Sequence, residues 1–147
     1  MLLTSTAFAN GSSIPRKYTC QGDNLPPPLA ISDVPAGTQS LALLMDDPDV
    51  PPSVRADRMW DHWVLFNIPP ATRTLQETSG TLGANTSGTQ AYAGPCPPDR
   101  EHRYYFKLYA LDCSLPLQAG ATKKQVEEAM RGHILAEATL MGRYNKS

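Results

Sequence analysis

The sequence has no excess of charge of either sign and no basic cluster. Its 13 basic and 14 acidic side chains give a net charge of −1, and no run of basic residues is longer than two. Proteins that bind nucleic acid commonly present a basic face to the phosphate backbone, so we do not expect nucleic acid to be the partner. The contents of apolar residues (41%) and charged residues (18%) are those of an ordinary globular chain.

Long apolar runs are also missing. The first residues, MLLTSTAFANGSS (1–13), have no positive segment and no apolar stretch long enough to cross a bilayer. We therefore expect neither a secretory signal nor a transmembrane segment, and we predict a cytoplasmic location.

Cysteine is scarce. The three cysteines, Cys20, Cys96 and Cys113, form an odd and scattered set, unlike the framework of a disulfide-rich domain. Free thiols are the simplest interpretation, although a disulfide between two of the three stays open.

Proline and glycine, in contrast, are abundant, with 14 and 10 residues that interrupt the chain at short intervals. This punctuation favours strands and turns over a helical bundle, so we predict one β-rich domain over residues 1–147. The predicted strands are an early ribbon over 6–11 and 12–20, an extended segment at 24–31, and the apolar runs 40–47, 62–69 and 102–112. The polar segment 71–94 is predicted to be a surface loop with at most one strand.

One helix is predicted near the carboxyl end. Thr122 and Gln125 have the spacing of a capping box. Apolar residues then recur at helical spacing from Val126 to Met141, so the helix is expected to continue to Gly142, with Gly132 as a weak point where it kinks or divides. A last strand at 143–144 is expected to follow.

Three polar side chains occupy matching positions on the predicted strands. By alternation, Asp47 ends the apolar face of its strand, whereas His62 and His102 begin the apolar faces of theirs. If the first strand runs antiparallel to the other two, all three side chains meet at one rim of the core. The pattern therefore predicts a pocket with an apolar floor and a polar mouth.

The chemistry of this predicted pocket favours an anion. Imidazole N–H groups, the Tyr104 hydroxyl and the backbone amides of a loop beginning at Gly94 can donate to a phosphate, sulfate or carboxylate. Asp47 is expected to orient a histidine, because its own charge repels an anion. Each residue also has a plain structural interpretation, Asp47 as a turn residue and the histidines as rim residues, and His133 is expected to be structural.

Two enzymatic interpretations are open as alternatives. Cys96 and His102 could form an activated thiol, and two histidines with a carboxylate could hold a catalytic metal, either of which would suit a hydrolase. Cys96 lies between two prolines with no helix amino terminus after it, and the histidine spacing matches no tight metal motif. We therefore predict a binding protein and not an enzyme, with neither a cofactor nor a bound metal.

Several segments in this order resemble the phosphatidylethanolamine-binding protein family, also called Raf kinase inhibitor-like proteins, in its short bacterial branch. The resemblance covers nearly the whole chain and is carried by DPDVP (47–51), DHWVLFNIP (61–69) and GPCPPDREHRYYFKLYALD (94–112). It is supported by IPRKYTCQGDNLPPPL (14–29) and GHILAEATLMGRY (132–144).

The resemblance implies an antiparallel Greek-key β-sandwich with a C-terminal helix and a small anion pocket without catalytic activity. The implied ligands are phosphate, a phosphomonoester or a phospholipid head group, and the implied partners are kinases or other regulated proteins, with a homodimer as the assembly. The implied pocket residues are Asp47, Asp49, Trp60, His62, Gly94, Pro95, His102 and Tyr104.

Overall fold

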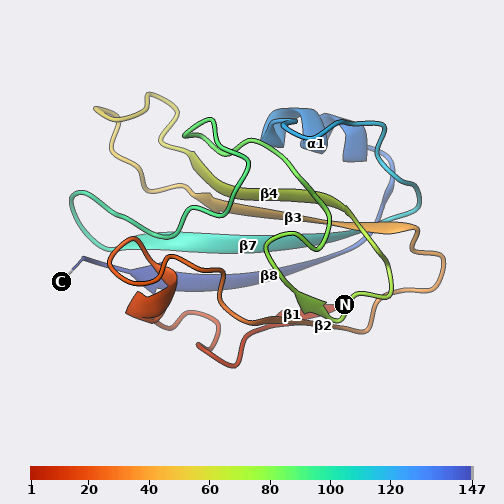
Figure 1. Cartoon of the computed structure of the whole chain (residues 1–147), viewed down its shortest axis with the longest axis horizontal. Coiled ribbons are helices and arrows are strands. Elements are labelled where there is room, and N and C mark those ends of the chain that lie inside the picture. The colour runs from red at the N-terminus through yellow and green to blue at the C-terminus, as the bar shows by residue number, and fades with distance from the viewer. Residues whose placement is uncertain (147) are drawn as a thin grey trace.

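Two antiparallel sheets pack face to face in the computed structural model, which describes residues 1–146 (Figure 1). The small sheet has the order β1-β2-β5 and the large sheet the order β6-β4-β3-β7-β8. The elements are β1 (Leu2–Thr4), a 3-10 turn (Arg16–Tyr18), β2 (Leu29–Ser32), β3 (Ser40–Asp47), β4 (Trp60–Ile68), β5 (Thr74–Leu75), β6 (Thr81–Leu82), β7 (His102–Leu111), α1 (Lys123–Met130) and β8 (Ile134–Tyr144). The predicted mainly β fold with one helix near the carboxyl end is confirmed.

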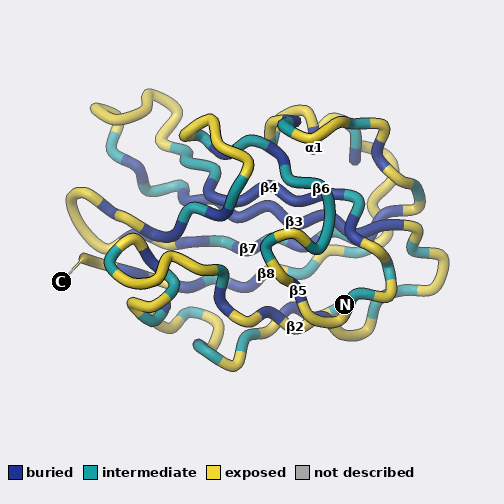
Figure 2. Tube along the Cα trace, in the orientation of Figure 1, coloured by how far each residue is buried: buried dark blue, intermediate teal, exposed yellow. Residues whose placement is uncertain are grey.

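The central strand β3 is buried on both faces (Figure 2). Leu41, Leu43 and Met45 point into the core between the two sheets. Ala42 and Leu44 point into a second apolar cluster beneath α1. A continuous apolar run is therefore what this strand needs, since neither of its faces meets water.

The capping box of α1 is confirmed, because the Thr122 side chain accepts from the Gln125 N–H while the Gln125 side chain accepts from the Thr122 N–H. Lys123, the first helical residue, places its Nζ 2.9 Å from Oδ2 of the buried Asp46 on β3. Val126 and Met130 are fully packed on the large sheet. Among residues 1–146, no helix has the length and hydropathy needed to cross a membrane.

The predicted extent of this helix was wrong. The helix ends at Met130, Gly132 takes a positive φ of 80°, and residues 134–144 form β8 along the whole of β7. Apolar spacing alone could not separate the two structures, since the stripe after Gly132 also suits a strand. Pairing with β7, whose edge would otherwise be open, decides in favour of the strand.

The predicted early ribbon over 6–20 was also wrong. The strand at this end is β1, before the predicted ribbon, and Arg16–Tyr18 forms a 3-10 turn. Residues 11–14 instead bond to the edge of β8, as in the Ile14 N–H bond to the Arg143 carbonyl. The segment is thus held by side-by-side contact with the carboxyl end of the chain.

Strand β4 departs from simple alternation. Met45 pairs with Trp63 and Asp46 pairs with Asp61, so His62 is an extra residue in a β-bulge. Val64, predicted to share the face of His62, points toward α1 instead. The bulge turns His62 to the other side of the sheet, where its ring meets that of Tyr104.

Candidate anion-binding site

A cavity of about 380 Å³ lies where β3 ends and where β4 and β7 begin. These strands run antiparallel, as predicted, so the three polar side chains meet at one rim. Six of the eight predicted site residues line the cavity, namely Asp47, Trp60, His62, Gly94, His102 and Tyr104. Val50 and Val54 add apolar lining.

Asp47 holds His102 in place, as the sequence predicted. Its Oδ2 lies 2.6 Å from the Nδ1 of His102, and both side chains are buried. Its Oδ1 accepts from the Asp49 N–H at 2.8 Å, which closes the turn after β3. Asp47 therefore makes both predicted contacts, one within the turn and one to a histidine.

Asp99 is a site residue that sequence reasoning missed. Its Oδ1 lies 2.6 Å from the Nε2 of His102, and its side chain is 39% exposed. The hydrogen bond from His102 lowers the pKa of Asp99. The imidazolium form of His102, with a proton on each nitrogen, satisfies both carboxylates. The only signal in the sequence was the spacing of three residues between Asp99 and His102.

His62 and Tyr104 each present an unpartnered polar atom. The Nε2 of His62 and the hydroxyl of Tyr104 are buried without a hydrogen-bond partner. His62 donates from Nδ1 to the Ala93 carbonyl at 2.7 Å, and burial lowers the pKa of His62, so its Nε2 is an acceptor in the neutral ring. Burial raises the pKa of Tyr104, and the nearby Asp47 charge adds to this, so the hydroxyl keeps its proton.

Gly94 lines the cavity, but its N–H is already used. It donates to the side-chain oxygen of Asn24 at 2.8 Å. A Cβ at this position would come within 2.6 Å of the Tyr18 carbonyl and within 2.9 Å of Thr19 Cα. Glycine is therefore required here for close packing against the 18–24 loop, and the amide predicted to face an anion faces Asn24 instead.

Asp49 and Pro95 do not line the cavity. Arg103 holds Asp49 in a two-pronged ion pair, with Nε 2.9 Å from Oδ2 and Nη2 2.8 Å from Oδ1, and this contact lowers the pKa of Asp49. The Pro95 carbonyl accepts from the Cys20 N–H. Both residues therefore contact neighbouring segments and not the cavity itself.

Cys20 and Cys96 form a disulfide, with a Cα–Cα distance of 5.5 Å. The expectation of free thiols was therefore wrong for these two residues, and it holds for Cys113. Sequence could not select this pair, because the bond depends on the 3-10 turn segment packing against the 94–98 loop. Both cysteines line the cavity, so the disulfide is part of its wall.

This disulfide also overturns the thiol-enzyme alternative, since Cys96 has no thiolate to offer. The geometry of the two histidines does not favour the metal alternative either. Both nitrogens of His102 and the Nδ1 of His62 already have partners, and within residues 1–146 the group of potential metal ligands is elsewhere.

Comparisons with known proteins agree with this architecture. The sequence profile described as phosphatidylethanolamine-binding protein matches residues 4–145. A UPF0098 protein of Chlamydia muridarum is 52% identical over 149 residues, covering 99% of each chain. The crystal structure of a putative phosphatidylethanolamine-binding protein homolog from Chlamydia trachomatis matches with a TM-score of 0.95 at 52% identity, covering 99% of this chain and 97% of the other.

A more distant structure shows the same fold. Escherichia coli YbcL, described as a member of the mammalian PEBP family, has a TM-score of 0.88 at 28% identity over 99% of this chain and 98% of its own. The profile match over nearly all of the sequence, together with these relatives, shows that this chain belongs to the phosphatidylethanolamine-binding protein family.

Proposed function

We propose that this protein is a non-enzymatic binding module whose cavity takes phosphate, a phosphomonoester or a phospholipid head group. The observation that carries the proposal is that two residues lining the cavity, His62 and Tyr104, each hold a buried polar atom without a partner, His62 Nε2 and the Tyr104 hydroxyl. Buried polar groups nearly always have partners, so two without one beside a cavity call for a ligand that supplies them.

The two atoms need hydrogen-bond partners of opposite kinds. Neutral His62 accepts a hydrogen through Nε2, whereas the Tyr104 hydroxyl donates one. A singly protonated phosphate or phosphomonoester offers both an O–H group and acceptor oxygens. Sulfate has acceptor oxygens and no hydrogen at neutral pH, so it can satisfy Tyr104 but not neutral His62.

His102 would supply the cationic contact. The Tyr104 ring lies 5.2 Å from the His62 ring and 6.4 Å from the His102 ring, centroid to centroid. A phosphate oxygen that takes the place of the Asp99 carboxylate would therefore receive a charge-assisted bond from His102 Nε2. Asp47 stays behind the ring and stabilises its charge.

The proposal extends to partners. A phosphorylated side chain of a protein partner, including a kinase or its substrate, presents the same monoester as a small ligand. Binding it would let the module modulate that partner without catalysis.

We also propose a homodimer as the working assembly, because the sequence resembles the bacterial branch of the family.

Calorimetric titration tests the ligand class. We expect phosphate to bind more tightly than sulfate at pH 7, because its singly protonated form offers the neutral His62 Nε2 a hydrogen that sulfate lacks. Phenyl phosphate is expected to gain the same advantage as the pH falls toward its second pKa of about 6. Glycerophosphoethanolamine and vesicles containing phosphatidylethanolamine distinguish a lipid head group from a free monoester. Equal affinity for sulfate and phosphate at all pH values would contradict the assignment of His62.

Variants test the site. Tyr104→Phe and His62→Phe are each expected to weaken phosphate binding by about tenfold, the value of one hydrogen bond to a charged group. His133→Phe, on the opposite end of the sheet, is the matched control and is expected to bind normally. The proposal fails if correctly folded Tyr104→Phe and His62→Phe both bind phosphate like the parent, or if the parent binds none at millimolar concentration.

A further inference from the structure

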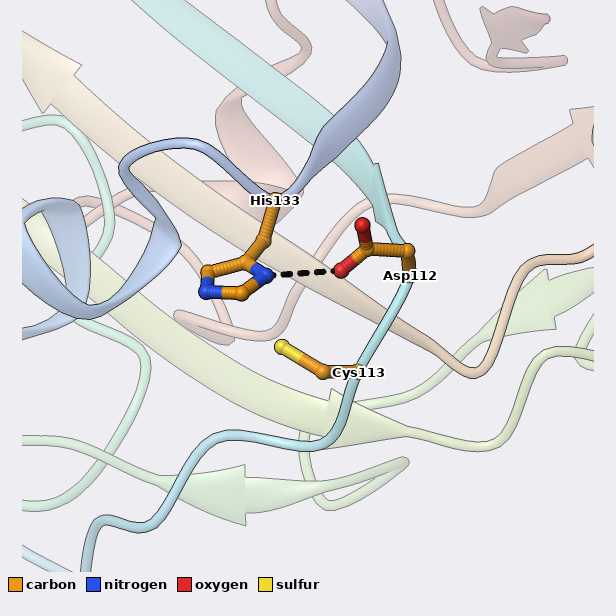
Figure 3. A group of neighbouring side chains, drawn as sticks. All are labelled: Asp112, Cys113 and His133. Atoms are coloured by element: carbon orange, nitrogen blue, oxygen red, sulfur yellow. Dashed lines mark hydrogen bonds and ion pairs between the residues drawn. The ribbon is translucent and has the colours of Figure 1, made fainter.

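Three side chains of types that can bind a metal meet where β7 ends and β8 begins (Figure 3). Asp112 and Cys113 directly follow β7, and His133 directly precedes β8. One potential ligand atom from each of the three lies within 4.8 Å of the others. Figure 3 shows the Cys113 sulfur directed toward the paired Asp112 and His133 side chains.

The backbone beneath these side chains is fixed. The Asp112 N–H donates to the His133 carbonyl at 3.0 Å, and the Cys113 carbonyl accepts from the Ser40 hydroxyl at 2.7 Å. Gly132, with its positive φ, turns the chain out of α1 and delivers His133 to the sheet. The three ligands therefore come from a rigid end of the sheet, which reduces the cost of bringing them together.

The side chains themselves have room to adjust. Asp112 and His133 are each 46% exposed. His133 Nδ1 lies 2.8 Å from Asp112 Oδ1, which is shorter than the ~3.3–3.8 Å between two ligand atoms of a tetrahedral zinc ion. Metal binding would thus replace one exposed hydrogen bond, worth little in water, by two metal–ligand bonds.

We propose that Asp112, Cys113 and His133 form a binding site for one divalent transition metal of borderline softness, zinc above all. A thiolate and an imidazole select against magnesium and calcium, which prefer oxygen ligands. Three protein ligands on an exposed edge leave a fourth position for water or an external ligand.

The sulfur of Cys113 is available as a ligand, because Cys113 is outside the disulfide. Metal binding would displace the thiol proton, as zinc does with other cysteine ligands. The site lies at the opposite end of β7 from the anion cavity, roughly 30 Å away for a ten-residue strand, and does not depend on it.

Zinc and cobalt titrations of the intact chain test the proposal. We expect one equivalent of zinc to compete with a chromophoric chelator, and one equivalent of cobalt to give thiolate-to-cobalt charge-transfer absorption. Cys113→Ser is expected to abolish that absorption, and Cys113→Ser and His133→Asn to weaken zinc binding by at least about tenfold each. Excess magnesium is expected not to compete.

Asp57→Asn is the matched control, because Asp57 is likewise an exposed carboxylate in a pair, here with Arg55. It is expected to bind zinc like the parent, whereas Asp112→Asn binds more weakly. All three ligand residues are at least partly exposed, so their variants are expected to fold. The proposal is overturned if the parent binds no zinc at micromolar concentration, or if binding survives Cys113→Ser unchanged.

Discussion

The two ends of β7 carry the same kinds of side chain in opposite surroundings. At the first end, His102 and Asp47 form a pair with almost no exposure, beside the Cys20–Cys96 disulfide. At the other end, His133 and Asp112 form a pair with about half of each side chain exposed, beside a free cysteine. Burial keeps His102 and Asp47 paired with each other, since neither side chain can turn to water. Exposure lets His133 and Asp112 separate, as the proposed metal site requires.

The largest difference between the two ends is expected in the cysteines. Replacing Cys20 and Cys96 together by Ser should lower the free energy of unfolding by about 4 kcal/mol, because the disulfide closes a separation of 76 residues. Cys113→Ser should change it by less than about 0.5 kcal/mol. Denaturant unfolding measures the free energy of unfolding of both variants. Similar losses of stability in the two variants would show that the cysteines at the two ends of β7 do not differ as expected.

The next largest difference concerns the aspartates. Asp47→Asn removes the buried one of the two carboxylates that contact His102, and leaves only the partly exposed Asp99. It is expected to cost about 3 kcal/mol of stability. Asp112→Asn breaks an exposed pair and is expected to cost no more than about 0.5 kcal/mol. Thermal or denaturant unfolding at pH 7 makes the comparison, and an equal cost at both ends would show that burial is not what distinguishes them.

A pH series separates the buried and exposed histidines. Burial lowers the folded-state pKa of His62 below its ordinary value of 6.5, so the unfolded chain takes up this proton first. The neutral ring thus contributes stability above pH 6.5 that is lost as the pH falls toward the folded-state pKa. The loss approaches about 1.4 kcal/mol per pH unit.

Unfolding measured from pH 7 to 5.5 checks this expectation. His62→Phe should show a shallower fall in stability than the parent, whereas His133→Phe should follow the parent. Identical slopes in the His62→Phe variant and the parent would mean that His62 does not carry the effect.

The smallest expected effect sharpens the role of Asp99. Because its carboxylate occupies the His102 nitrogen that an anion would use, Asp99→Ala is expected to tighten phosphate binding by about two- to fivefold. Asp112→Ala, which removes the corresponding partner at the exposed end, should leave phosphate affinity unchanged. Weaker phosphate binding in Asp99→Ala would instead make Asp99 a supporting residue of the site.

The sequence predicted the cavity rim well and the connections poorly. Alternation on β3 and β7 correctly brought Asp47, His102 and Tyr104 together, because both strands follow the period of two through their site ends. The same rule placed His62 correctly for the wrong reason, since a bulge moves it away from the face of Val64. No residue type in the segment predicts that bulge.

Local patterning by itself determined the apolar run of β3, the capping box of α1 and the polar residues at the strand ends, because these depend on near neighbours in the chain. Tertiary structure decided the Cys20–Cys96 bond, the contact of Asp99 with His102 and the strand β8 where helical spacing was read. Each of these depends on which distant segment packs alongside. That choice rests on sheet pairing and burial over the whole molecule, which no short stretch of sequence contains.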